Sequence, residues 1–439
     1  MILGLGPQAS AQINGASRAS EVRTEANTEK TTQALPSEQA LDRFAAFFKE
    51  RSTAHGIVGA SLRVVGEEGL LHHTSFGSRD RAAGVPVEES TIYHWASITK
   101  TMTGIAILQL RDRGRLSLDD SILRYVPELE AVHNSFGPMS AITLRQLLSH
   151  TAGFRAGTWP FGGDKPWHPL EPTDWSQLVS MMPYTEVEFS PGSKYSYSNP
   201  GLVYLGRVIE KISGEPFEQY IQKNILTPLE MTRAFFDHAP YHLLNDRSHS
   251  YFLSKGHLSE APFDFDTGIT VSNGGLNAPL GDMEKYVRFL MGHAGTPQGA
   301  AVLSRASLEE MWKPVALVET VGDDRVDMGL CFFIETRSGR RLIGHSGSQN
   351  GFISHLYLDA ASHAGYVVSF NTEANEEAAL PNTRKLDAEV REFFVANVAP
   401  ALQGSRSRPA VWSRRQSPDT VLDWHSPLAI PPESVPRSS

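Results

Sequence analysis

Strand-like runs near both ends of the 439-residue chain, with a long helical block between them, constrain the fold more than any other feature of the sequence. Two apolar runs, 57–65 and 70–76, are separated by Gly-Glu-Glu-Gly, which predicts a hairpin. Three more strands are predicted late in the chain, at 341–344, 352–358 and 366–371. We expect both ends of the chain to build one sheet. The predicted fold class is therefore α/β and two-lobed: a mostly antiparallel sheet flanked by terminal helices, with a helical lobe inserted.

Helical periodicity fills the segment between the strands and also flanks them. The first helix is predicted to begin at Ser37, which can cap it, because the apolar residues that follow recur at helical spacing. The other predicted helices span 97–113, 144–149, 202–212, 217–225, 281–291 and 383–398.

The composition of the two ends predicts the limits of the folded domain. Residues before Pro36 are small, polar and charged without apolar periodicity, and residues after 399 are rich in Ser, Arg and Pro. We therefore expect a disordered leader or the remnant of an export signal at 1–35, one folded domain at 36–399 and a flexible tail at 400–439. Within the domain, the sheet lobe is expected at about 36–90 and 320–399, and the helical lobe at about 91–319.

The leader leaves the location of the protein open. Ala9-Ser10-Ala11 resembles a signal-peptidase site, but a positive n-region is missing and the apolar run Ile2–Leu5 is too short for an h-region. A truncated export signal favours a periplasmic or secreted protein, and a plain polar leader is compatible with a cytoplasmic one.

Charge and cysteine content exclude several classes of function. Lys and Arg number 40 against 49 Asp and Glu, a formal net charge of −9, so no basic footprint for nucleic acid is present. The single cysteine, Cys331, builds neither an intrachain disulfide nor a zinc or iron–sulfur site. Among the 16 histidines there is no His-Glu-x-x-His, so no metal and no cofactor is expected. No apolar run reaches the roughly 20 residues of a membrane-spanning helix, and the oligomeric state is not predicted.

The first motif with chemical content is Ser97-Ile98-Thr99-Lys100, at the start of a predicted helix. Spacing i, i+3 places Ser97 and Lys100 on one face. A lysine can take the proton of a serine hydroxyl if burial and the positive helix start lower its pKa from about 10.4. The alternative is an N-cap serine followed by a solvated lysine.

The second motif is Tyr197-Ser198-Asn199, in a loop bounded by Pro and Gly. Placed near an ammonium, Tyr197 is expected to ionise, to act as a base toward Ser97 and then as an acid toward a leaving group. The alternative is a tyrosine that packs on the next helix while Asn199 caps it.

The third motif is Gly344-His345-Ser346-Gly347-Ser348, at the end of a predicted strand. Glycine there lets a substrate approach the backbone closely, and the amide of Ser348 can face a developing oxyanion. The alternative is a hairpin corner.

These three motifs in this order resemble those of the penicillin-recognising serine hydrolases, which include class C β-lactamases, DD-peptidases, D-aminopeptidases and esterases of family VIII type. Supporting signatures are the run Leu147–Phe154 and Gly274-Gly275-Leu276. The resemblance spans roughly 41–398 and implies a β-lactamase/transpeptidase-like fold.

The resemblance also implies roles. Ser97 is the nucleophile, Lys100 its activating partner, Tyr197 the acid/base and Asn199 a substrate-orienting amide. The backbone N–H groups of Ser97 and Ser348 form the oxyanion hole.

One departure bears on the substrate. Many β-lactamases have Lys-Thr-Gly as the third motif, whereas this chain has His345-Ser346-Gly347. Since histidine is mostly neutral at pH 7, strong β-lactamase activity is expected less than esterase or D-amino-acid and DD-peptidase activity. Ser346 retains a hydroxyl that can donate to a substrate.

Two functional readings follow for a small-molecule or peptide substrate. The first is a serine hydrolase that acts through an acyl-enzyme on an ester, amide or β-lactam bond. The second is a non-turnover member of the same fold, a penicillin-binding sensor or a scaffold. An α/β-hydrolase is excluded because the Gly-x-Ser-x-Gly spacing is absent at Ser346. Aromatic residues in the loops 155–175 and 240–267 suit either an apolar acyl group or packing on the body.

Overall fold

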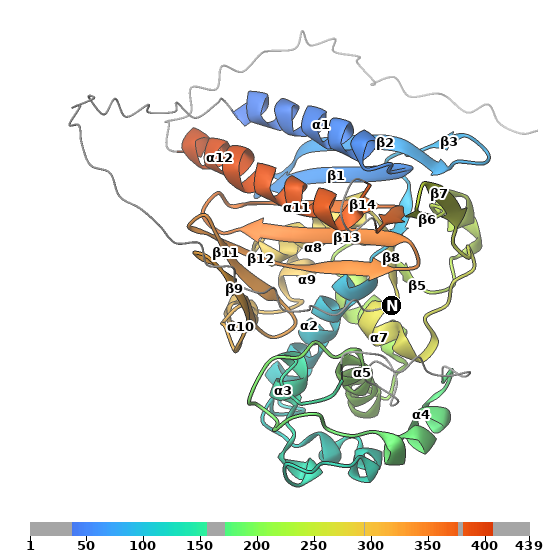
Figure 1. Cartoon of the computed structure of the whole chain (residues 1–439). Coiled ribbons are helices and arrows are strands. Elements are labelled where there is room, and N and C mark those ends of the chain that lie inside the picture. Colours follow the sequence, from blue (N-terminus) through green and yellow to red (C-terminus); the bar gives the residue numbers. More distant parts are fainter. Residues whose placement is uncertain (1–36, 156–171, 294, 376–380, 407–439) are drawn as a thin grey trace, which may run out of the picture. The chain divides into compact units, whose positions relative to one another are not determined.

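The computed structural model describes residues 37–155, 172–293, 295–375 and 381–406. Within these residues the two ends of the chain meet in one nine-stranded sheet (Figure 1). Strand β1, from the start of the chain, pairs antiparallel with β14, from its end, with Leu62 opposite Val368. In spatial order the strands are β3 (Val85–Pro86), β2 (Gly69–Asp80), β1 (Gly59–Gly66), β14 (Ala364–Phe370), β13 (Phe352–Asp359), β12 (Arg340–Gln349), β11 (Phe333–Arg337), β10 (Asp324–Met328) and β9 (Ala316–Val321).

Apolar side chains on both faces of the sheet explain why it is covered on both sides. Helices α1, α11 and α12 cover one face, where Phe44 and Phe394 pack against Tyr366 of β14. The opposite face belongs to the larger core, which includes α2, α5 and α8. The helices are α1 (Ser37–Ala54), α2 (Thr99–Asp112), α3 (Leu144–Leu148), α4 (Trp175–Met181), α5 (Asn199–Ser213), α6 (Phe217–Ile221), α7 (Val271–Gly274), α8 (Leu280–Leu290), α9 (Pro297–Ala300), α10 (Arg305–Met311), α11 (Thr383–Phe393) and α12 (Ala399–Arg406).

Two small sheets complete the described strands. One contains β4 (Ile92–His94), β8 (Leu276–Pro279) and β5 (Phe235–Phe236), and the other contains β15 (Thr372–Ala374), β6 (Tyr251–Ser254) and β7 (His257–Glu260). The segment that contains α3, α4 and α5 forms the helical part of the structure, below the large sheet in Figure 1. The predicted two-lobed α/β architecture, with one antiparallel sheet built from both chain ends, is therefore confirmed.

The structure differs from the sequence prediction at several elements. Strands β9, β10 and β11 were not predicted, because they are short, carry several charged residues and lie toward an exposed sheet edge. The strand predicted at 341–344 runs on to Gln349, so the third motif lies within a strand rather than at a hairpin corner. The closing helical segment continues past 398 into α12. The leader and most of the predicted tail lie outside the described residues.

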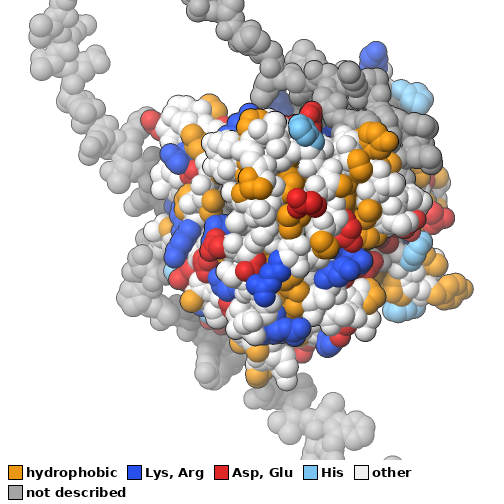
Figure 2. Space-filling view, turned by 90° about the horizontal axis from the view of Figure 1, so that it is seen from below, with side chains coloured by type: hydrophobic (Ala, Val, Ile, Leu, Met, Phe, Trp, Pro, Cys, Tyr) orange, Lys and Arg blue, Asp and Glu red, His pale blue; other side chains and the backbone are white. Residues whose placement is uncertain are grey.

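The surface carries charges of both signs. Figure 2 shows one face, seen from below relative to Figure 1, with basic and acidic side chains interspersed. Among the described residues, no helix has the length and apolar character needed to cross a bilayer.

Candidate active site

Ser97 is held at the start of α2 by the small sheet of β4 and β8. The backbone N–H of Trp95 donates to the carbonyl of Leu276 at 2.8 Å, and its indole N–H donates to the carbonyl of Ala278 at 2.8 Å. Ala96 then takes a left-handed backbone conformation with φ of 47°. Such a conformation is strained for a residue other than glycine and is frequent at functional sites. This conformation of Ala96 ends the extended backbone of β4. Ser97 then lies in a short 3₁₀ turn, Ala96–Ile98, just before α2.

Lys100 lies one turn further and is completely buried. Its Nζ lies 2.8 Å from Ser97 Oγ and 2.8 Å from the backbone carbonyl oxygen of Asn273. Burial lowers the pKa of Lys100 to about 7, because the charged form loses its hydration. A large fraction of Lys100 is thus an uncharged amine near neutral pH, and an amine at this distance can accept the hydroxyl proton of Ser97. The alternative of a solvated lysine is wrong.

Tyr197 completes the contacts of Ser97. Its hydroxyl interacts with the Ser97 side chain, and Lys100 Nζ lies over its ring, 5.0 Å from the centroid. Burial raises the pKa of Tyr197 far above its ordinary value of about 10. The expectation that Tyr197 ionises is therefore wrong, because the free-energy cost of burying a charged phenolate dominates. Tyr197 is a protonated phenol at neutral pH and is placed to relay or donate a proton.

His150 is a further residue of the site, and the sequence analysis gave it no role. It follows α3 with a left-handed φ of 56°, and its ring stacks on Tyr197 with centroids 4.5 Å apart. Its Nδ1 accepts a hydrogen bond from the backbone N–H of Ser198 at 3.0 Å. Burial and the nearby Lys100 hold the pKa of His150 well below its usual value, so its ring is neutral. His150 thereby fixes the second motif to α3. In the sequence, His150 lies within the run Leu147–Phe154, which is one of the supporting signatures of the family resemblance.

Asn199 is the first residue of α5. Ser198 caps this helix through a hydrogen bond from the backbone N–H of Gly201 to its Oγ at 3.2 Å, so the predicted capping role falls to Ser198. The side chain of Asn199 lines the cleft beside Ser97, and its Oδ1 is buried without a hydrogen-bond partner. The carbonyl oxygen of this amide therefore has unused hydrogen-bonding capacity beside the cleft.

Strand β12 brings the third motif against the start of α2. A Cβ added at Gly347 would lie 2.2 Å from the carbonyl oxygen of Trp95 and 2.5 Å from Ser354 Oγ. Only glycine allows this approach, because a real Cβ contact of that length is a clash. The approach places Ser348 on the wall of the same cleft as Ser97.

His345 lies beneath this wall and is completely buried. Its ring is near those of Tyr197 and Phe333, and its Nδ1 lies 2.6 Å from the carbonyl oxygen of Ser346. Burial and, next, the charge of Lys100 lower the pKa of His345 to about 3. His345 is thus an uncharged, buried residue that lies near the ring of Tyr197 and does not line the cleft.

An arginine stands at the outer end of β12. Arg384, at the start of α11, donates to Ser348 Oγ at 3.0 Å and also lies 3.6 Å from Glu373. The Arg384 side chain is 63% exposed, so water screens its charge.

The cleft that contains Ser97 has a volume of about 240 Å³. It lies between β12, α5, α7 and the segment that precedes α7. Its lining residues are Ser97, Pro172, Thr173, Asn199, Phe265, Asp266, Thr267, Gly268, Thr270, Asn273, Ser348 and Gln349. Of the aromatic residues in the loop 240–267, Phe265 lines this cleft. Trp159, Phe161 and Trp167 of the other loop lie outside the described residues.

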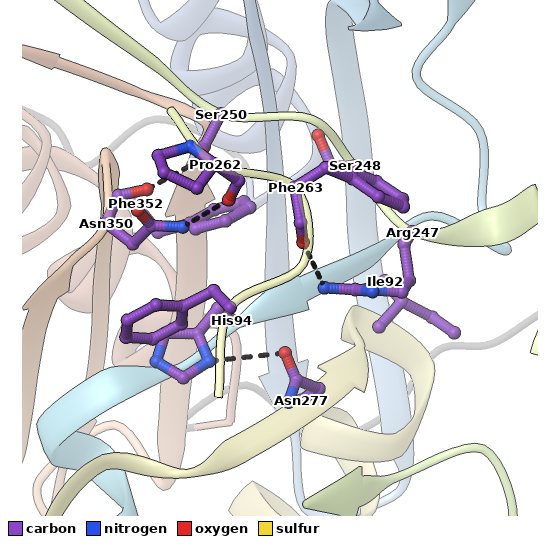
Figure 3. Close-up of a pocket in the computed structure, with 11 residues that line it drawn as sticks. Ile92, His94, Arg247, Ser248, Ser250, Pro262, Phe263, Asn277, Asn350 and Phe352 are labelled. Atoms are coloured by element: carbon purple, nitrogen blue, oxygen red, sulfur yellow. Dashed lines mark hydrogen bonds between the residues drawn. The ribbon is translucent and has the colours of Figure 1, made fainter. Parts of the chain in front are cut away.

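A second cavity lies behind β4 and is shown in Figure 3. Its free volume of about 10 Å³ is the space that a single water molecule requires. His94 bounds it, and its Nδ1 lies 3.2 Å from Asn277 Oδ1 (Figure 3). The other ring nitrogen of His94, Nε2, lies 3.1 Å from Gln349 Oε1. This cavity is too small for a substrate, but its wall holds Gln349 at the edge of the cleft.

The three motifs thus converge on Ser97, as the sequence analysis required. Ser97, Asn199 and Ser348 line the cleft. Lys100 does not line it, but its Nζ contacts Ser97 Oγ. Ser346 and Gly347 are not among the residues that line the cleft. Asn273 and Gln349 do line it and had no predicted role, although both adjoin quoted motifs. Among the described residues, no three His, Cys, Asp or Glu side chains gather in a way that could hold a metal ion.

The chain is similar in sequence to known proteins. The sequence model of the Beta-lactamase family matches residues 44–390, well over half of the chain. The protein flp of Staphylococcus aureus (strain NCTC 8325 / PS 47) is 25% identical over 315 residues, which are 72% of this chain and 60% of that protein. The chain thus spans about three fifths of that relative's length.

Solved structures show the same fold. The octameric penicillin-binding protein homologue from Pyrococcus abyssi aligns with a TM-score of 0.66 at 26% identity, over 80% of this chain and 77% of that one. The D-amino acid amidase from Ochrobactrum anthropi SV3, in complex with L-phenylalanine, aligns with a TM-score of 0.65 at 20% identity, over 84% and 99%. The chain belongs to the Beta-lactamase family.

Proposed function

We propose that this member of the Beta-lactamase family is a serine hydrolase that cleaves an ester, amide or β-lactam bond through a covalent acyl-enzyme on Ser97. One observation carries the proposal: Ser97 Oγ lies 2.8 Å from the Nζ of a completely buried lysine and opens into a cleft of about 240 Å³. A nucleophile, a base with its pKa near the working pH and room for a substrate are the requirements of this chemistry.

In the acylation step, uncharged Lys100 takes the proton of Ser97 as Oγ bonds to the substrate carbonyl carbon. The negative charge that develops on the carbonyl oxygen is stabilised by the backbone N–H groups of Ser97 and Ser348. When the bond to the leaving group breaks, the phenol of Tyr197 donates its proton to that group and recovers one from Lys100. Water then attacks the acyl-enzyme with the same groups in reverse order, which frees Ser97.

The charges near the cleft bear on the substrate class. His345, which stands where many β-lactamases have a lysine, is uncharged and buried, and the cation of Arg384 is exposed and close to Glu373. A substrate carboxylate therefore meets no buried positive charge from the third motif. This favours uncharged esters and amides, including D-amino-acid derivatives, over efficient β-lactam hydrolysis.

The test is covalent labelling by a fluorophosphonate probe together with hydrolysis of p-nitrophenyl acetate. Wild type is expected to be labelled and to turn over continuously, and Ser97→Ala to lose both. Ser193→Ala, which changes an exposed serine near the second motif, serves as the matched control and is expected to behave as wild type.

The outcomes separate the two readings. A single burst of p-nitrophenol, one equivalent per protein, followed by no release, would support the non-turnover sensor. Labelling retained in Ser97→Ala would contradict the nucleophile.

A further inference from the structure

The side chain of Asn273, a residue that lines the cleft, holds a buried hydrogen-bond donor that the mechanism does not use. Asn273 lies in α7, is only 6% exposed and lines the cleft with Ser97. Its backbone carbonyl oxygen accepts from Lys100, whereas its Nδ2 has no hydrogen-bond partner among the described residues. A buried donor without a partner is unfavourable, so an amide of this kind beside a nucleophile is suited to an acceptor that arrives with the substrate.

The position of Asn273 relative to Tyr197 indicates which part of the substrate it meets. Tyr197, the proposed proton donor to the leaving group, contacts Ser97 from the side of His150 and His345. None of these three side chains lines the cleft. The leaving group is thus expected on the Tyr197 side of Ser97, and the cleft with Asn273 is left for the acyl group.

A second polar atom without a hydrogen-bond partner, Asn199 Oδ1, indicates which functional group that acyl group carries. Asn199 Oδ1 is buried without a partner and belongs to the same cleft, so the wall offers one free donor and one free acceptor. A secondary amide carries the complementary pair, a carbonyl oxygen and an N–H. The carboxylate in this cleft, Asp266, already accepts from the backbone N–H of Gly268 at 2.7 Å and pairs with His238 at 3.1 Å.

We propose that Asn273 is a specificity-determining residue whose Nδ2–H donates to an amide carbonyl in the acyl part of the substrate. The cleft then selects N-acylamino or peptide-like acyl groups over alkyl chains of the same length. This inference rests on the proposed function, because it assigns the acyl group of the Ser97 acyl-enzyme.

The experiment compares two p-nitrophenyl esters of matched length, N-acetylglycinate and pentanoate. For each, kcat/KM is measured in wild type and variants, with the Ser97→Ala protein as the blank for spontaneous hydrolysis. Wild type is expected to prefer the N-acetylglycinate, and Asn273→Ala to lower the ratio of the two kcat/KM values by about 10–100-fold, the effect of one lost hydrogen bond in a buried site. Asn273→Ser, which keeps a donor, should recover part of the ratio. Asn245→Ala, at an exposed asparagine, should leave it unchanged.

The readouts distinguish recognition from structural support. Because Asn273→Ala keeps the backbone carbonyl that contacts Lys100, the midpoint of the pH–rate profile with pentanoate should stay within a few tenths of wild type. Equal losses on both esters, or a shifted midpoint, would overturn the inference and assign Asn273 to the support of Lys100. A wild-type protein that is neither labelled by fluorophosphonate nor active on either ester would overturn the proposed function itself.

Discussion

At the residue scale, the proposed acylation step depends on the protonation state of Lys100. Since burial lowers the pKa of Lys100 to about 7, the uncharged amine becomes more abundant as pH rises through neutrality. We expect kcat/KM for an uncharged ester such as p-nitrophenyl pentanoate to rise with pH, with a midpoint near 7, and then to level off. This is checked by measuring initial rates of hydrolysis between pH 5 and 9 and subtracting the spontaneous rate found with the Ser97→Ala protein. A profile that is flat across pH 6 to 8 would show that Lys100 is not the base.

The same burial has a cost in stability. The folded-state pKa of Lys100 lies below its unfolded value of about 10.4, so the penalty is fully present below pH 7 and disappears as pH rises toward 10. Lys100→Met is expected to abolish hydrolysis and to raise the free energy of unfolding at pH 6 by on the order of 2 kcal/mol, net of the hydrogen bonds lost. The gain should shrink toward pH 10.

Thermal unfolding at pH 6 and pH 9.5 measures this effect. Lys49→Met, at an exposed lysine of α1, is the matched control and should show no such pH dependence. A Lys100→Met protein that is less stable than wild type at pH 6 would mean that the contacts of Lys100 with Ser97 and Asn273 outweigh its desolvation.

At the element scale, the site requires strand β12 and the start of α2 to touch through their backbones. Gly347→Ala would bring a Cβ to 2.2 Å from the carbonyl oxygen of Trp95, so the strand must move away from Ser97. We expect kcat/KM to fall by at least about 10²-fold, since even a displacement of about 1 Å misplaces an oxyanion donor. Far-ultraviolet circular dichroism should stay as in wild type.

The control for this variant is Gly339→Ala, in the β11–β12 turn, where an added Cβ meets no atom within 4 Å. Its positive φ of 74° makes it a test of backbone strain without a clash. If Gly347→Ala retains wild-type kcat/KM, Ser348 does not act through a fixed distance to Ser97.

At the scale of the whole molecule, the two faces of the large sheet have separate tasks. The core beneath α1, α11 and α12 joins the two ends of the chain: Phe44 lies 5.4 Å from Phe393 and 6.5 Å from Tyr366, centroid to centroid. Phe44→Ala is expected to cost about 3–5 kcal/mol of stability through the cavity it leaves. Well below its lowered Tm, the variant should keep wild-type kcat/KM, because this core is separate from the one that contains α2.

Calorimetry and ester hydrolysis on the same samples test this separation. Phe136→Ala removes a phenylalanine that is 50% exposed and should change Tm little. A large loss of kcat/KM in folded Phe44→Ala protein would show that the two cores are coupled through the sheet.

Much of this architecture was within reach of the sequence. The helix at Ser37, the hairpin of β1 and β2 and the late strands β13 and β14 follow from local periodicity, which a core-facing element must show whatever surrounds it. The short edge strands β9 to β11 escaped prediction because their pairing, rather than an apolar pattern, makes them strands.

The sequence by itself determined which residues we assign to the site, since Ser97, Lys100 and Tyr197 occur in motifs whose order resembles that of one family. Only the tertiary structure decided their states. The charge of Lys100, the neutrality of His345 and the protonation of Tyr197 all follow from burial, and burial is created by segments far away in the sequence. Asn273 belongs to the same class: no local pattern shows that its amide lacks a partner, because hydrogen-bond satisfaction is settled only when every neighbour is in place.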